Sequence, residues 1–93
     1  MKPDLEYEYN NWINHLSNIK KLSQNSVISY KNDLSKFLIF FQDYIEKNIG
    51  LKEIENIEIS EFRSFLTHRR NSEISSNSIA RNISALKSFF RFL

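Results

Sequence analysis

Cysteine is absent from the sequence, and glycine and proline occur only once each in 93 residues. The lack of cysteine excludes disulfides and thiolate metal sites. An all-β chain would need many turn residues, so the scarcity of glycine and proline favours a helical fold. His15 and His68 are far apart, and neither lies at a metal-ligand spacing. We therefore expect no metal ion and no cofactor.

Long apolar runs are also absent, since none approaches the roughly 20 residues that a membrane-spanning helix requires. The N-terminal stretch MKPDLEYEY is acidic and lacks the apolar core of a signal peptide. The apolar fraction is 41%, which is enough for one small core. The sequence thus predicts one cytoplasmic domain over residues 1–93 that contacts no membrane.

The net charge is only +2, but the charged side chains are unevenly distributed. Residues 43–61 carry two basic and six acidic side chains, whereas residues 62–93 carry six basic and one acidic, a net charge of +5. This C-terminal third is a candidate surface for an anionic partner. On charge alone, an ordinary solvated helix face explains it equally well.

Apolar residues recur at intervals of three and four along four segments, so we predict an all-α bundle of four helices. The predicted helices begin near Pro3, after Ser23, near Ile59 and after Ser75. Gly50 is expected to be the left-handed residue that closes the second helix, and residues 51–57 to form an irregular connection. Either Glu58 or Ser60 could cap the third helix.

The last helix is strongly amphipathic, with an expected buried stripe and an apolar edge beside it. The buried stripe consists of Ile79, Ile83, Leu86, Phe90 and Leu93. The edge consists of Ala85, Phe89 and Phe92. Opposite the stripe lies a basic and hydroxylated band, which suits a phosphate backbone or a major groove, although a plain solvated face is the alternative. The band consists of Arg81, Ser84, Lys87, Ser88 and Arg91.

The starts of the second and fourth helices repeat one pattern, LSQNS and ISSNS. Ser23 and Ser75 fit as N-caps, with Leu22–Val27 and Ile74–Ile79 at the spacing of hydrophobic staples. Neither first turn contains an acidic residue, although an acid there would be stabilising by about 0.3–1 kcal/mol. Such starts leave N–H groups available to an external anion. Coincidence remains the alternative, because Ser and Asn are common near caps.

Two longer stretches carry a family resemblance. The first stretch, residues 22–41, reads LSQNSVISYKNDLSKFLIFF. It resembles a pattern that begins with Leu-Ser-x-x-Thr/Ser and continues with Tyr, a basic residue, any residue, Asp-Leu and then Phe. The second stretch, residues 76–93, reads SNSIARNISALKSFFRFL. It resembles the pattern Thr/Ser-Ile-x-Arg-x-Leu-Ser-Ala-Leu-Arg-x-Phe-Phe. Order and spacing agree from about Trp12 to Leu93. The chain therefore resembles the N-terminal core-binding domain of tyrosine recombinases of the phage integrase family, especially the Xer group with XerC and XerD.

The resemblance implies a small SAM-like bundle that forms one half of a C-shaped clamp on double-stranded DNA. It implies that the second and fourth helices cross and that their N-terminal parts face the major groove. The positions that match DNA-facing ones are Gln24, Asn25, Ser26, Lys31, Ser75, Ser76, Asn77, Arg81 and Lys87. Arg81 and Lys87 are expected at phosphates, and Asn25 and Asn77 at phosphates or base edges. For Asp33, we expect a structural hydrogen bond or ion pair.

The family's chemistry is DNA strand exchange through a tyrosine nucleophile of a C-terminal domain, and no stretch of this sequence matches its catalytic motifs. The chain is thus expected to bind DNA without cutting it and to take no small-molecule ligand. Its longer parent is expected to be an enzyme that acts with a related recombinase subunit in a tetrameric synaptic complex. The start of the chain directly before the first helix favours chromosome dimer resolution by a Xer-type recombinase.

Two alternatives remain open. The domain could come from a mobile-element integrase. It could also be a helical protein-interaction module that uses the Phe89/Phe92 edge.

Overall fold

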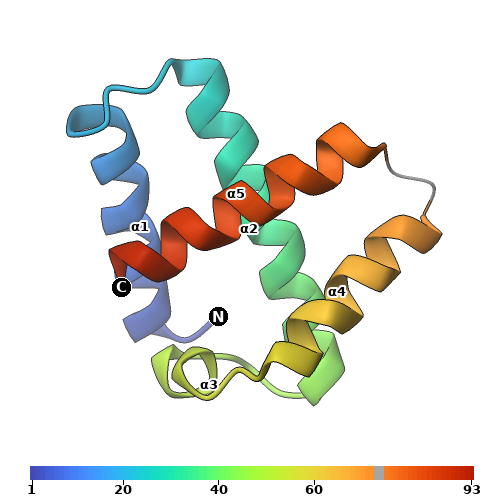
Figure 1. Cartoon of the computed structure of the whole chain (residues 1–93). Coiled ribbons are helices and arrows are strands. Elements are labelled where there is room, and N and C mark those ends of the chain that lie inside the picture. Colours follow the sequence, from blue (N-terminus) through green and yellow to red (C-terminus); the bar gives the residue numbers. More distant parts are fainter. Residues whose placement is uncertain (73–74) are drawn as a thin grey trace.

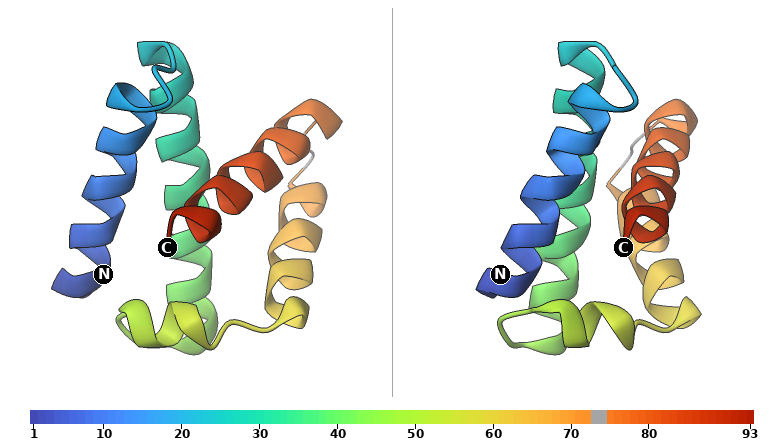
Figure 2. Two further views of the ribbon diagram at one scale, coloured as in Figure 1. Left: turned by 60° about the vertical axis from the view of Figure 1, so that its left-hand side comes forward. Right: turned by 90° about the vertical axis from the view of Figure 1, so that its left-hand side faces the viewer.

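The computed structural model describes residues 1–72 and 75–93, and the described residues form helices and no strand. The helices are α1 (Pro3–Asn18), α2 (Gln24–Ile45), α3 (Leu51–Glu55), α4 (Ile59–Asn71) and α5 (Ser76–Phe92). α1 and α2 lie side by side, α3 spans one end, and α5 crosses α2 (Figures 1 and 2). The predicted all-α class is confirmed, with one short helix more than expected. No helix of the described segments has the length and apolar character to cross a membrane.

The core is built from aromatic side chains that different helices contribute. Trp12 of α1 and Phe89 of α5 are fully buried and meet edge to face, with ring centroids 5.4 Å apart. Phe37 of α2 and Phe65 of α4 meet in the same way at 5.2 Å. Trp12 Nε1 also donates a hydrogen bond to Ser88 Oγ at 3.1 Å, which pairs the polar atom of the buried indole. These contacts fix α5 against α1 and α4 against α2.

The prediction for the end of α2 was wrong. The left-handed residue is Glu46, with φ of 56°, whereas Gly50 has φ of −131° and precedes α3. Side chains crowd position 50, because a Cβ atom there would lie 2.8 Å from Asp4 Oδ1 and from Lys2 Cδ and would have to displace them. The predicted irregular connection contains α3, which begins where the Gly50 N–H donates to Glu53 Oε1 at 2.7 Å.

The start of α4 resolves the ambiguity between Glu58 and Ser60. Glu58 is the N-cap residue, and its backbone N–H donates to Glu61 Oε1 at 3.0 Å. The side chain of the third helical residue thus satisfies an N–H group that the helix leaves open. Ser60 lies inside the first turn.

Glu53 joins the start of α3 to the N-terminus of the chain. Its carboxylate accepts the Gly50 N–H and lies 3.3 Å from Lys2 Nζ. The hydrogen bond from Gly50, followed by the bond and charge of Lys2, holds the pKa of Glu53 below its ordinary value. The Lys2 N–H in turn donates to the Ile49 carbonyl at 2.6 Å.

We predict that Glu53→Gln lowers the free energy of unfolding at neutral pH and that this difference shrinks in acid. A carboxylate with a lowered folded pKa contributes stability above its unfolded pKa, and this contribution is lost as the pH falls through the folded pKa. Urea unfolding from pH 7 to pH 3 measures the difference. Glu55→Gln, an equal change of charge on the same helix, is the control. A pH-independent difference between the two variants would contradict the role assigned to Glu53.

The buried face of α5 is rotated relative to the predicted stripe. Its buried residues are Ile79, Asn82, Ala85, Leu86 and Phe89. Ala85 and Phe89 are fully buried because α5 packs against α1 as well as α2, and the Phe92 ring lies 5.2 Å from that of His15. The Phe89/Phe92 edge is therefore not a free surface, which removes the observation behind the protein-interaction alternative.

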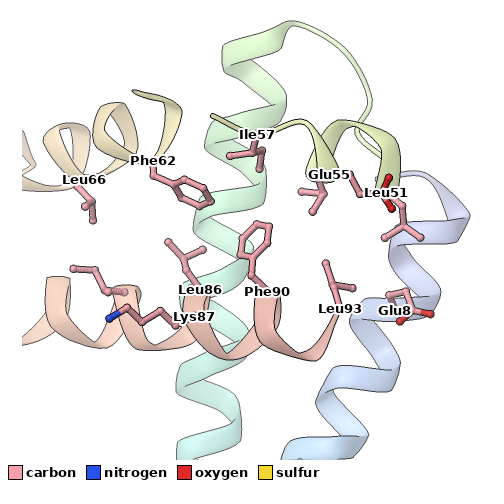
Figure 3. Close-up of a pocket in the computed structure, with 12 residues that line it drawn as sticks. Glu8, Leu51, Glu55, Ile57, Phe62, Leu66, Leu86, Lys87, Phe90 and Leu93 are labelled. Atoms are coloured by element: carbon pink, nitrogen blue, oxygen red, sulfur yellow. The ribbon is translucent and has the colours of Figure 1, made fainter. Parts of the chain in front are cut away.

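Ile83, Phe90 and Leu93 of the predicted stripe instead line an open apolar groove of about 890 Å³. Figure 3 shows this groove between α5 on one side and α3 and α4 on the other, with Phe62 and Phe90 pointing toward each other. Their ring centroids lie 5.4 Å apart. Leu93 is 46% exposed, so this side of the bundle removes less apolar surface from water than the Trp12 side does.

The two neighbouring phenylalanines of α5 should therefore differ in their contribution to stability. Phe89→Ala should cost about 3–5 kcal/mol, as expected for a fully buried phenylalanine, and Phe90→Ala about half of that. The two changes are matched in helix propensity, since the same residues are exchanged on the same helix. Urea denaturation measures both. Equal losses would contradict the observed rotation of α5.

Candidate nucleic-acid interface

Ser23 caps α2 with its side chain. Its backbone is extended, and Ser23 Oγ accepts the Ser26 N–H at 3.2 Å. Ser23 Oγ also donates to Ser26 Oγ at 3.0 Å. Within the described residues, no acceptor takes the N–H groups of Gln24 and Asn25, and the first turn contains no acidic residue.

Ser75 repeats this arrangement at the start of α5. Ser75 Oγ accepts the Ser78 N–H at 3.2 Å and donates to Ser78 Oγ at 3.1 Å. The first turn of α5 is again free of acidic residues. The predicted serine caps are thus confirmed at both helices. The proposed staple partner Ile74 lies outside the described residues.

All nine predicted DNA-facing residues are exposed. Gln24, Asn25 and Ser26 form the first turn of α2, and Ser76 and Asn77 open α5. α2 and α5 cross, and their N-terminal ends diverge from the crossing (Figure 1). Whether these residues contact DNA stays a prediction.

Lys31 lies eight residues beyond Ser23, about 12 Å along α2, and Lys87 lies still further from its helix start. Lys87 is twelve residues beyond Ser75, about 18 Å along α5 at 1.5 Å per residue. It borders the apolar groove and also a hollow of about 650 Å³ that Lys20 and Arg91 line. Lys87 therefore belongs to a separate basic surface on the outer side of α5.

Arg81 is not a free cation. Its Nε donates to Asp33 Oδ2 at 2.7 Å, and its Nη2 donates to Asp33 Oδ1 at 3.3 Å. Asp33 has no exposed surface, whereas 46% of the Arg81 side chain is exposed. The hydrogen bond and the charge of Asp33 raise the pKa of Arg81 further above its already high value. The expected structural ion pair of Asp33 is thus present, and its partner is a predicted DNA-facing residue.

Asn82 extends this ion pair into a chain of four side chains. Its Nδ2 donates to Asp33 Oδ1 at 2.7 Å, and its Oδ1 accepts from Arg69 Nε at 3.0 Å. Asn82 has no exposed surface. The network therefore joins α2, α5 and α4, and no buried side-chain N or O atom of the described residues is left unpaired.

Sequence reasoning missed Asn82 and Arg69. A signal for Asn82 was present, because it lies three residues after Ile79 and four before Leu86, at a position on the apolar face. A polar residue at such a position predicts a buried partner. Arg69 carried no comparable signal, since it lies in the last, largely basic turn of α4.

The basic and hydroxylated band on α5 is interrupted. Ser88 accepts the hydrogen bond of Trp12 and is part of the core packing rather than of the outer face. Among the described residues, no group of three His, Asp or Glu side chains converges to hold a metal ion.

Comparison with known proteins agrees with this architecture. Residues 9–93 match the family model of the phage integrase, N-terminal SAM-like domain. The chain belongs to this family. Within it, the crossing helices α2 and α5 carry both of the stretches on which the resemblance depends.

The similar relatives include proteins named tyrosine recombinase XerC. The one from Brucella suis biovar 1 (strain 1330) is 33% identical over 92 residues, which cover 99% of this chain and 29% of the relative. The one from Rickettsia conorii is 37% identical over 84 residues, 90% of this chain and 28% of the relative. No solved structure matches the chain. The chain therefore spans less than a third of the length of these relatives.

We predict that Arg81→Ala destabilises the domain by about 3 kcal/mol, because it leaves the buried Asp33 carboxylate without its opposite charge, although Asn82 still donates to it. Lys87→Ala, a similar loss of charge on the same helix, should change stability by less than about 0.5 kcal/mol. Adding Asp33→Asn to Arg81→Ala should restore part of the loss, since it removes the buried charge. Denaturant unfolding of the four proteins measures this. An unaltered stability of Arg81→Ala would contradict a structural ion pair.

Proposed function

We propose that this chain is the DNA-binding N-terminal domain of a site-specific tyrosine recombinase and clamps one recombination half-site. The observation that carries the proposal is the pair of serine-capped, acid-free helix starts on the two helices that cross. Each start combines backbone N–H groups that find no acceptor within residues 1–72 and 75–93 with the positive end of a helix dipole, which suits a phosphate group. The family membership and the net charge of +5 over residues 62–93 support the same anionic partner.

We extend this proposal to the longer protein. The relatives named XerC are more than three times as long as the matched region, which leaves room for a separate catalytic domain. In our proposal, that domain supplies the tyrosine nucleophile, whereas the described residues bind the DNA and position the protein on it. The full protein would act with a related recombinase subunit in a tetrameric synaptic complex and resolve chromosome dimers. The names of the relatives favour this role over that of a mobile-element integrase.

The two helix starts permit a test in which stability and DNA binding move in opposite directions. Asn25→Asp and Asn77→Asp each place one carboxylate in an acid-free first turn with almost no change of shape. Each should raise the free energy of unfolding by about 0.3–1 kcal/mol, because a negative charge complements the helix dipole. Each should also weaken binding to duplex DNA several-fold, since the new charge repels phosphate.

Fluorescence anisotropy with a labelled 30-base-pair duplex, from 50 to 200 mM salt, measures the binding. Asn10→Asp, on the exposed face of α1, is the matched control and should leave affinity nearly unchanged. Equal losses in all three variants would mean that only net charge matters and that the helix starts have no special part. The absence of any DNA binding by the unaltered chain at 50 mM salt would refute the proposed function.

A further inference from the structure

The Arg81 guanidinium is held in one orientation by two hydrogen bonds to a single buried carboxylate. Nε and one N–H of Nη2 are committed to the two oxygen atoms of Asp33. A guanidinium has five N–H donors in a planar fork, so three remain. Two of them point in parallel from the edge formed by Nη1 and Nη2, and the third, on Nη1, points toward the Cδ side of the guanidinium. The edge formed by Nη1 and Nη2 thus offers two parallel donors that Asp33 does not occupy.

The carboxylate itself is also fixed. Asp33 is fully buried, and Asn82 holds its Oδ1 atom at 2.7 Å. Asn82 is in turn oriented by Arg69 Nε at 3.0 Å. Rotation of the Arg81 fork would therefore break both of its bonds to Asp33, because Asn82 prevents the carboxylate from turning with it. The donor edge of Arg81 is preorganised before any ligand arrives.

The pairing also removes most of the attraction that Arg81 could exert on a phosphate backbone. A lysine or arginine gains DNA affinity mainly by replacing counterions at a phosphate, which requires an uncompensated charge. Arg81 shares its charge with Asp33, whereas Lys31 and Lys87 form no salt bridge within the described residues. Arg81 keeps the fixed orientation of its free N–H donors although its charge is compensated. Oriented donors are the groups that recognise a base edge.

Arg81 is also placed between the two candidate phosphate sites. It lies six residues after Ser75, about 9 Å along α5, and Asp33 lies ten residues after Ser23, about 15 Å along α2. A duplex held at both helix starts would pass the crossing of the two helices (Figure 1). Arg81 is exposed and joins the two helices through its bond to Asp33. Guanine presents two adjacent acceptors, O6 and N7, in the major groove, and these match a two-donor fork.

We propose that Asp33 is a positioning residue that holds Arg81 as a specificity-determining fork for the O6 and N7 edge of a guanine in the half-site. This inference rests on the proposed function and deepens it, because it assigns a base contact to a residue whose charge alone suggests phosphate. Asn82 supports the same geometry from the other side of Asp33.

The test begins with selection of bound duplexes from a random-sequence library by the 93-residue chain. The selected duplex is then compared with a copy in which 7-deazaguanine, which lacks the N7 acceptor, replaces each guanine in turn. We expect one guanine at which this replacement weakens binding by about tenfold, since a good bidentate contact discriminates by at least that order.

Two variants distinguish the orientation of Arg81 by Asp33 from a role of this ion pair in fold stability alone. Arg81→Lys keeps the charge and can still pair with Asp33 but has no fork. The double variant Asp33→Asn/Asn82→Asp keeps the net charge but exchanges the carboxylate and the amide. The carboxylate then faces Arg69, and Arg81 faces a neutral amide. Both should lose the tenfold effect of 7-deazaguanine at that position and still bind random duplex. Arg63→Lys, an exposed position on α4, is the matched control and should keep the effect.

The outcomes distinguish this inference from the proposed function. If Arg81→Lys retains the same guanine preference, the inference is overturned whether or not the double variant folds. Binding of the unaltered chain without any guanine effect also overturns it, while the DNA-binding function stands. A chain that binds no duplex at 50 mM salt overturns both.

Discussion

The carboxylate of Asp33 is the constraint on which the arrangement of the bundle depends. A fully buried charge is tolerated only when hydrogen bonds and an opposite charge compensate it, and Arg81 and Asn82 together supply both. Because these partners lie on α5, the carboxylate fixes both the rotation and the axial position of α5 across α2. Apolar packing alone tolerates sliding and rotation of helices, whereas a directional polar network does not. The rotation in turn directs Phe89 toward Trp12 and leaves Phe90 in the groove.

Stability and the proposed interaction place opposite demands on the two helix starts. Serine caps satisfy one backbone N–H group at each start, and they do so without adding charge. An acidic residue in the first turn would stabilise either helix but would occupy or repel the position of a phosphate. The starts of α3 and α4 show the other choice, since Glu53 and Glu61 accept backbone N–H groups there. Only α2 and α5 lack acid in the first turn, among the helices from α1 to α5.

Local features of the sequence predicted much of this molecule, whereas tertiary ones did not. Helical periodicity located four of the helices, and a serine flanked by apolar residues at staple spacing predicted both caps, because caps depend on residues close in sequence. The prediction that Gly50 closes the second helix was wrong. The surroundings of Gly50 are set by the approach of Asp4, which lies 46 residues earlier in the chain. The buried face of α5 was misassigned because a helical wheel ranks apolar residues without knowing that α1 lies beside α2. The partner of Arg81 was likewise invisible, since Asp33 precedes it by 48 residues.

The uneven packing of the two sides has a consequence for internal motion. The side that contains the Trp12–Phe89 contact is built from fully buried aromatic rings, whereas the side between α3, α4 and α5 opens into an apolar groove. Segments with fewer buried apolar contacts open at lower free energy than the global unfolding transition. Amide hydrogens of α3 and α4 should therefore exchange with solvent sooner than those at the centre of α2 and α5. The two helices that carry the candidate interface are thus expected to open least often, whereas local opening is expected mainly at α3 and α4.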